Sequence, residues 1–363
     1  MALMNTNTRY IFDTLLEYSD RLAAKFPDGL DTIFFVNSGS EAGDLAQRIA
    51  RTVTGQRNTV VVDHAYHGNT IAGIEVSPYK YEGKGGPGKA DHIYKLEIPD
   101  GFRGKYRYDD PDAGMKYARE VDMILKDRQS KSEGIAAFYC ESIIGCGGQV
   151  VLPEGYLNYV YQKIREKGGL CIADEVQVGF GRVGEQFWGF ELQQVVPDIV
   201  VLGKPMGNGH PMAAVITTKA IAEQFNNGME FFSSFGGNPV SCAIGLEVLN
   251  VIEEEGLQQH AFETGAYFKD SLLALMSTYE LIGDVRGYGL FLGIEFIEDR
   301  STLTPATVKT KAIVEDMKNR GIMLSTDGPY NNVIKIKPPL VFNRRNVDRV
   351  VSTLDEVLNR IEK

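Results

Sequence analysis

The chain has 363 residues, of which 43% are hydrophobic and 24% charged, an ordinary composition for a globular protein with a substantial core. It carries 38 Lys and Arg against 48 Asp and Glu, a formal net charge of −10, which argues against nucleic acid or an anionic membrane as a partner. The sequence contains no run of about 18 apolar residues, so we expect no membrane span. The four cysteines form no Cys-x-x-Cys pair, which indicates free thiols in a reducing compartment, and we expect a cytoplasmic protein.

The first two thirds of the sequence alternate between predicted helices and short apolar strands. Apolar residues at helical spacing predict helices over 11–26, 42–55 and 156–168. Short apolar runs predict strands over 32–36, 58–63, 135–142, 170–176, 198–203 and 212–218. This alternation predicts an α/β fold with a mostly parallel sheet.

The pattern changes after about residue 250. Helices are expected over 261–279, 307–321 and 345–362, and an alternating strand over 289–297. These elements indicate a smaller α+β unit. We therefore predict a large domain over residues 1–250 and a small C-terminal domain over residues 251–363.

Three charged residues stand where a parallel sheet binds ligands. Glu141, Asp174 and Lys204 each come at or just after the end of an apolar run, and ligands of such sheets lie outside the carboxyl ends of the strands. A lysine and an acid at one edge suit pyridoxal 5′-phosphate, which needs an amine for a Schiff base and an acid beside its pyridine nitrogen. Burial would favour the neutral amine. Each residue alone also fits a simpler role, Lys204 as a surface side chain and Asp174 as a helix cap or ion-pair partner.

The segment NSGSEA offers a phosphate site. Ser38, Gly39 and Ser40 precede a predicted helix, whose free N–H groups and dipole favour an anion. Ser38 followed by Glu41 also matches a plain capping box, which does not exclude phosphate. The segment HAYHGNT adds Tyr66 and His67 as flat groups that can stack on a ring.

Two other motifs are weaker. His64 and His67 have a spacing that suits a metal, but no carboxylate or cysteine set accompanies them, and we expect no metal. Residues 179–184, GFGRVG, match the dinucleotide pattern Gly-x-Gly-x-x-Gly, but the aromatic stretch EQFWGF that follows predicts no helix. A glycine-rich loop beside the site is the better interpretation.

Five stretches together resemble the class III pyridoxal-phosphate-dependent aminotransferases: NSGSEA, AYHGNT, IADEVQVGFGRVG, VLGKPMGNGHPMAAV and SSFGGNPVSCAIGLEVL. The stretches LMNTNTRYIFD, VSPYKYEGKGGPGK and PDGFRGKY are most similar to the subgroup of type 2 alanine–glyoxylate aminotransferases and ethanolamine-phosphate phospho-lyases. The resemblance implies pyridoxal 5′-phosphate as cofactor and the fold-type I transferase fold.

The resemblance also implies roles for single residues. Lys204 forms the Schiff base with the cofactor, and Asp174 pairs with its pyridine nitrogen. The other implied contacts are Gly39 and Ser40 on the phosphate, Val176 and Tyr66 on the two ring faces, and Gln177 near the ring hydroxyl. Ser234 reaches the phosphate of the partner subunit, which implies a homodimer with a shared active site. Ser38, His67 and Glu141 complete the predicted cofactor site.

The implied reaction is transamination, in which an amino group passes from a small amino acid to a 2-oxo acid. One alternative is a phospho-lyase acting on an O-phosphorylated amine such as phosphoethanolamine. A set of basic residues in two loops fits either a substrate phosphate or plain solvation: Lys80, Lys84, Lys89, Arg103, Lys105 and Arg107.

Three departures from the family pattern bear on these readings. Relatives carry a longer segment before NTNTRY, so a truncated homologue without turnover is a second alternative. Gly43 stands where relatives have asparagine, and glycine is a poor helix former, by about 1 kcal/mol relative to alanine. Lys335 stands where many relatives have an arginine near the substrate carboxylate, and lysine cannot bind a carboxylate in the bidentate manner of arginine.

Overall fold

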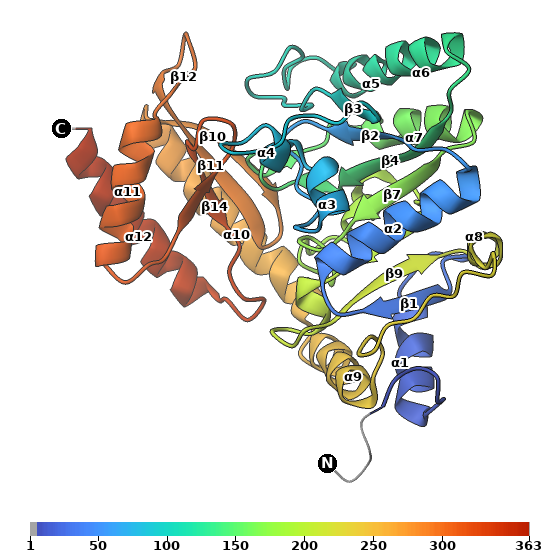
Figure 1. Cartoon of the computed structure of the whole chain (residues 1–363). Coiled ribbons are helices and arrows are strands. Elements are labelled where there is room, and N and C mark those ends of the chain that lie inside the picture. The colour runs from blue at the N-terminus through green and yellow to red at the C-terminus, as the bar shows by residue number, and fades with distance from the viewer. Residues whose placement is uncertain (1–5, 363) are drawn as a thin grey trace.

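A mixed seven-stranded sheet occupies the first part of the chain in the computed structural model, which describes residues 6–362 (Figure 1). Residues 1–5 and 363, the outer ends of the two predicted domains, lie outside this range. The strands are, in order across the sheet, β1 (Thr32–Val36), β9 (Ala213–Thr217), β8 (Ile199–Leu202), β7 (Leu170–Asp174), β4 (Ile135–Glu141), β2 (Asn58–Val62) and β3 (Ile93–Leu96). The strands from β8 to β3 run parallel, and β9 is antiparallel to both of its neighbours. The predicted α/β fold with a mostly parallel sheet is confirmed.

Helices cover both faces of this sheet, because alternate strand residues point to opposite sides. In β8, Val200 and Leu202 belong to the apolar core on one face, and Ile199 and Val201 to the core on the other. The first face carries α1 (Asp13–Ala23), α5 (Ala113–Ala118), α6 (Glu120–Ser130), α7 (Tyr156–Glu166) and α9 (Pro239–Glu254). The second carries α2 (Gly39–Thr54), α4 (Pro78–Tyr81) and α8 (Lys219–Phe225), with the short α3 (Ile71–Glu75) beside α2.

A second, antiparallel sheet follows in the last third of the chain. Its order is β10 (Ile282–Tyr288), β11 (Phe291–Asp299), β14 (Val333–Ile336) and β13 (Ser325–Asp327), and β12 (Thr304–Pro305) also pairs with β11. An apolar core joins this sheet to α10 (Leu257–Thr278), α11 (Thr307–Asn319) and α12 (Arg344–Ile361). These elements form the orange and red part that stands beside the large sheet in Figure 1. A small antiparallel pair, β5 (Ile143–Ile144) and β6 (Val150–Val151), follows β4.

The predicted elements agree with the observed ones to within a few residues at their ends. The strands β3, β10 and β14 were not predicted, because they are short or interrupted by polar and glycine residues. Within residues 6–362, no helix is long and apolar enough to cross a membrane. The division into two domains at residue 250 stays a prediction.

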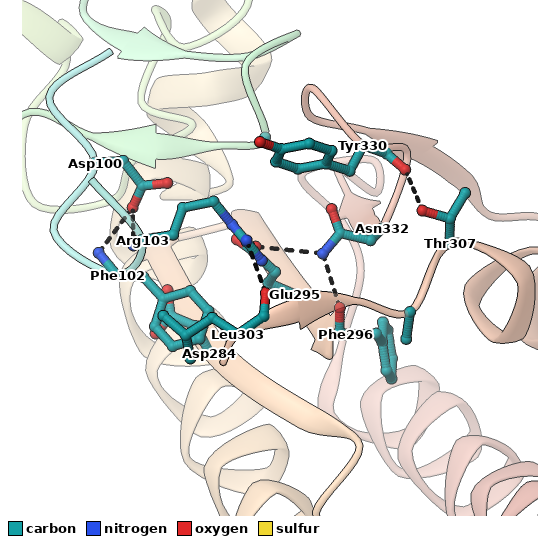
Figure 2. A network of polar contacts seen from close by, with 12 residues as sticks. Asp100, Phe102, Arg103, Asp284, Glu295, Phe296, Leu303, Thr307, Tyr330 and Asn332 are labelled. Carbon is teal, nitrogen blue, oxygen red and sulfur yellow. Dashed lines mark hydrogen bonds and ion pairs between the residues drawn. The ribbon is translucent and has the colours of Figure 1, made fainter. Parts of the chain in front are cut away.

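A buried ionic network joins the loop after β3 to the second sheet (Figure 2). Arg103 donates from Nε to Glu295 at 2.5 Å, and Glu295 also pairs with Arg286 at 2.6 Å. Arg286 in turn pairs with Asp284 at 2.8 Å and donates from Nε to the carbonyl of Gly148 at 2.9 Å. Only 4% of Arg286 and 2% of Glu295 are exposed. The network therefore fixes the second sheet against the edge of the first, where the candidate site lies.

Candidate active site

Three charged residues predicted from the sequence meet at one edge of the large sheet. The strands β4, β7 and β8 are parallel neighbours, so their carboxyl ends lie side by side. Glu141 ends β4 and pairs in register with Asp174, which ends β7. Lys204 follows β8 after one glycine and opens a 3-10 turn, in which Pro205 suits the first turn because its φ is already fixed. The strand order thus brings together residues that are far apart in the sequence.

Asp174 is buried and held on both carboxylate oxygens. His67 Nδ1 lies 2.8 Å from its Oδ2, and the backbone N–H of Val176 donates to its Oδ1 at 3.1 Å. The His67 ring stacks on Tyr139, with 3.9 Å between the ring centroids. A buried carboxylate requires such partners. His67, expected as a stacking group for a bound ring, instead stacks on Tyr139 and orients Asp174.

Glu141 is the second buried acid at this edge, with 4% of its surface exposed. The backbone N–H of Gly145 donates to its Oε2 at 3.1 Å, and Gln177 Nε2 approaches its Oε1 at 3.5 Å. Burial, followed by the nearby charge of Asp174, raises the pKa of Glu141 to about 8. Glu141 therefore keeps its proton at neutral pH, because burial beside a second acid disfavours its charged form.

The start of α2 meets the same strand ends. A Cβ atom on Gly39 would lie 3.1 Å from Val176, and one on Gly203 would lie 3.2 Å from the Cα atom of Gly39. The Ser38 side chain accepts from the backbone N–H of Glu41 at 3.2 Å, so the predicted cap is present. The free N–H groups of the first turn of α2 consequently lie at the edge that carries the two acids and the lysine.

Ser40 and Tyr66 tie the segment after β2 to this edge. Ser40 Oγ accepts from the backbone N–H of Asn69 at 3.0 Å. Tyr66 packs edge to face on Tyr79, with 6.2 Å between the ring centroids. Burial raises the pKa of the Tyr66 hydroxyl, and nearby acidic groups that include Asp174 act in the same direction. The AYHGNT segment therefore lies beside the predicted phosphate loop and the strand ends.

A cavity of about 670 Å³ opens at this edge. Its polar lining includes Lys204, Gln177, Arg182 and Lys337. Its apolar lining comes from Val176 and from side chains of α9, α10 and the segment after β14, among them Ile244, Val248, Val251, Leu257 and Leu340. Lys204 is exposed to this space. Of the two readings of Lys204, a surface side chain and a buried amine, the structure shows the exposed side chain, because the residue lies beyond the end of its strand and not within the core.

The six basic residues of the two predicted phosphate-binding loops do not gather. Lys80 alone among them approaches a predicted site residue, with its Nζ 5.6 Å from the Tyr66 ring centroid. The others have separate partners or face solvent: Arg103 binds Glu295, Lys105 binds Glu97, Arg107 donates to the Phe102 carbonyl, Lys89 donates to the Ile93 carbonyl, and Lys84 is exposed. Acids from other elements neutralise part of this set, which favours solvation over phosphate binding of the two readings that the sequence left open.

Other candidate residues lie apart from the site. Ser234 is exposed in the loop before α9, and the cavity lining does not include it. His64 contacts Asp63, with Nδ1 3.1 Å from Oδ1, while His67 faces Asp174. Within residues 6–362, no group of His, Cys, Asp and Glu side chains is arranged to hold a metal ion. The GFGRVG segment, in contrast, forms a loop whose Arg182 lines the cavity, and the element that follows is a 3-10 turn over Gly189–Gln193.

Sequence reasoning selected Lys335 and missed Lys337. Lys335 pairs with Asp327 at 2.8 Å, whereas Lys337 lines the cavity and donates to Gln177 Oε1 at 2.6 Å. Burial, and then the positive charge of Lys204, lowers the pKa of Lys337 to about 8. The alternation in VIKIKPPL contained the signal, because residues two apart lie on one face of a strand.

A sequence model of the family described as Aminotransferase class-III matches residues 1–358. The chain belongs to this family. An alanine–glyoxylate aminotransferase 2-like protein of Drosophila melanogaster is 47% identical over 99% of this chain and 74% of its own length. An ethanolamine-phosphate phospho-lyase homolog 1 of Caenorhabditis elegans is 40% identical over 100% of this chain and 80% of its own. A phospholyase from Arthrobacter, solved in complex with phosphoethanolamine, is 39% identical with a TM-score of 0.93, over 99% of this chain and 84% of that chain.

This class III aminotransferase has the fold-type I architecture and uses pyridoxal 5′-phosphate to move amino groups from amines or amino acids to oxo acids. The residues at the sheet edge fit that cofactor. A helix start suits its phosphate, and Asp174 and Lys204 supply the acid and the amine that its chemistry needs. Gly39, Gly203 and Val176 pack closely at this edge, and a Cβ atom on either glycine would crowd Val176.

Proposed function

We propose that this aminotransferase passes the amino group of a small amino acid to a 2-oxo acid at the edge formed by β4, β7 and β8. The observation that carries the proposal is the meeting of Lys204, Asp174 and the start of α2 at one sheet edge, where Lys204, Val176 and Gln177 line a cavity. The cavity volume of about 670 Å³ falls in the range of small-molecule sites. The apolar lining favours a substrate with a small, uncharged side chain.

The proposed cofactor contacts come from four segments of the chain. Ser38, Gly39 and Ser40 hold the phosphate through the N–H groups that open α2. The remaining contacts are Val176 and Tyr66 on the two ring faces, Gln177 near the ring hydroxyl, Asp174 at the ring nitrogen with His67 behind it, Glu141 next to Asp174, and Lys204 at the reactive carbon.

Bound pyridoxal phosphate supplies a carbonyl carbon for the amino group and a ring that draws electrons from the substrate α carbon. Asp174, oriented by His67 at 2.8 Å, places a negative charge that favours a protonated ring nitrogen. Glu141 stays protonated at neutral pH, since its pKa is about 8, and adds no second charge. Lys204 would hold the cofactor through its amine, and the same amine, when free, would take and return the α proton. Exposure to the cavity gives its Nζ access to that proton.

A phospho-lyase reaction is the second candidate, and Lys337 favours it. Its ammonium group lies in the cavity beside Lys204, where a cation can bind a substrate phosphate. The Arthrobacter phospholyase, 39% identical, was solved with phosphoethanolamine. In that reaction the bond to the β-phosphate would break after loss of the α proton, and water would then release the amino group as ammonia and the carbon skeleton as an aldehyde, so that no amino group would be transferred.

We further propose a homodimer in the cytoplasm. The exposed position of Ser234 supports a role at the phosphate of a partner subunit, because its own site is formed without it. The four cysteines are free, which suits a reducing compartment. Sedimentation should show a species larger than the 40.2 kDa chain, and a cofactor-loaded monomer would contradict the shared site.

Product analysis with two substrate sets separates the candidates. The purified holoenzyme is incubated with L-alanine and glyoxylate, and separately with phosphoethanolamine. The proposal predicts pyruvate and glycine from the first mixture and no free phosphate from the second. Release of free phosphate without formation of pyruvate would contradict transamination and support the phospho-lyase reaction. If the protein carries its cofactor but forms neither pyruvate nor phosphate, the result would support a homologue without turnover.

A further inference from the structure

A side-chain bridge crosses the cavity from the second sheet to the first. Lys337 directly follows β14 and donates to Gln177 Oε1 at 2.6 Å. Gln177 lies three residues beyond the end of β7, and its Nε2 approaches Glu141 Oε1 at 3.5 Å. Glu141 is held at its other oxygen by the backbone N–H of Gly145, at 3.1 Å. One amide thus links a lysine of the small sheet to an acid of the large one.

The Lys337 end of this bridge fixes which way the Gln177 amide points. Its carbonyl oxygen faces the Lys337 ammonium, and its NH₂ group faces the Glu141 carboxyl. A flipped amide would bring N–H donors against the three donors of Lys337, whereas a protonated Glu141 can bind either end of the amide. The site is also tightly packed, because a Cβ atom on Gly145 would lie 2.7 Å from Gln177 Nε2.

The bridge matters because Gln177 lines the cavity next to Lys204. With Oε1 committed to Lys337, the second N–H of the amide is the group left for a ligand. Without Lys337, the amide is free to turn and present its oxygen instead.

We propose that Lys337 is a positioning residue for the transfer reaction, which orients the Gln177 amide so that its N–H side faces the bound cofactor. The inference rests on the proposed function, since it assumes that the cofactor binds beside Lys204. The charged groups around Lys337 are Lys204, Lys335, Arg182 and Asp327, and those around Glu141 are Asp174 and Lys204. None of these surrounding groups has a hydrogen bond to Gln177 within residues 6–362, where its side-chain partners are Lys337 and Glu141.

The test is a pH titration of the visible absorbance of the bound cofactor, with four variants and one control variant compared to the wild type. Lys337→Met removes the donor, Lys337→Arg keeps one, Gln177→Leu removes the amide, and a double variant carries Lys337→Met with Gln177→Leu. We expect Lys337→Met to shift the titration midpoint by about 0.5 to 1 pH unit, which is the scale of one lost hydrogen bond near a charge. Lys337→Arg should recover most of that shift.

The double variant decides whether Lys337 acts through Gln177. If it does, Lys337→Met adds no further shift in the Gln177→Leu background. An equal shift in both backgrounds, or none in either, would overturn the inference. Lys335→Met is the matched control, because it removes a charge two residues earlier but leaves the contact to Gln177, and it should shift the midpoint less. A wild-type protein that binds no cofactor would instead refute the proposed function.

Discussion

Replacing Arg286 by leucine tests the ionic network that holds the two sheets together. Arg286 is buried, pairs with Glu295 at 2.6 Å and Asp284 at 2.8 Å, and donates to the Gly148 carbonyl at 2.9 Å. Leucine is apolar and leaves both acids buried without this cation. Removing one partner of a buried pair costs about 3–5 kcal/mol. Because Arg103 still pairs with Glu295 (Figure 2), we expect the lower end, about 3 kcal/mol.

The loss should depend on pH. Burial alone would raise the pKa of Glu295, but Arg286 and Arg103 outweigh burial and hold it below its ordinary value. A carboxyl with a lowered pKa contributes stability at neutral pH that is lost as the pH falls through its folded-state pKa. Arg286→Leu removes part of that contribution and leaves the burial penalty. The difference in unfolding free energy between wild type and variant should therefore be largest near neutral pH and smaller near pH 4.

Thermal unfolding followed by circular dichroism measures this effect. With about 2.1 cal/mol/K of unfolding entropy per residue, the 363-residue chain has about 0.8 kcal/mol/K, so 3 kcal/mol lowers Tm by about 4 °C. The control Arg360→Leu removes an exposed ion pair with Asp316 and should lower Tm by about 1 °C or less. The prediction is contradicted if Arg286→Leu and the control have the same Tm near neutral pH, or if the Tm loss of Arg286→Leu is as large near pH 4 as near neutral pH.

Two further substitutions have expected outcomes of opposite sign. Gly43→Ala should lower the free energy of unfolding, measured in urea, by about 1–3 kcal/mol, because its Cβ atom would lie 2.8 Å from the His67 carbonyl and the Tyr139 hydroxyl. Adding Tyr139→Phe should recover part of the loss. A Gly43→Ala protein more stable than the wild type would contradict a clash at this contact. Glu141→Gln in the cofactor-free protein should gain stability over wild type, by more than about 1 kcal/mol, as the pH rises from about 5 to about 8. The reason is that the stability which a buried carboxyl with a pKa raised to about 8 contributes to the folded protein is lost across that pH range. A difference in unfolding free energy between variant and wild type that does not depend on pH would therefore contradict a protonated Glu141.

The strand-end residues were predictable because they depend on local pattern alone. Asp174 ends the five-residue strand β7, and Lys204 comes one glycine after the four-residue strand β8. The rule that ligands sit at carboxyl ends places both at one edge. The glycine and serine residues that open α2 were predictable for the same reason, since caps and helix starts leave a short-range signal.

The misses depend on pairing across the fold. Arg103 looked available for a substrate phosphate, but Glu295, nearly two hundred residues later, is its partner. Lys337 was missed because the alternation in VIKIKPPL puts Lys335 and Lys337 on one face, and only the packing of β14 in the fold decides which of the two lysines lines the cavity. His67 was predicted to stack on a bound ring, but in the structure it stacks on Tyr139 of β4. This contact exists because β4 lies between β2 and β7 in the sheet.

Borohydride reduction of the holoenzyme, followed by digestion and mass spectrometry, tests the central claim most directly. Lys204 and Lys337 both line the cavity, and the pKa of Lys337, lowered to about 8 by burial and neighbouring cations, makes it a real competitor as the amine. The account predicts that the reduced cofactor is found on one peptide, which contains Lys204. A label on the peptide that contains Lys337, or on neither lysine, would contradict it.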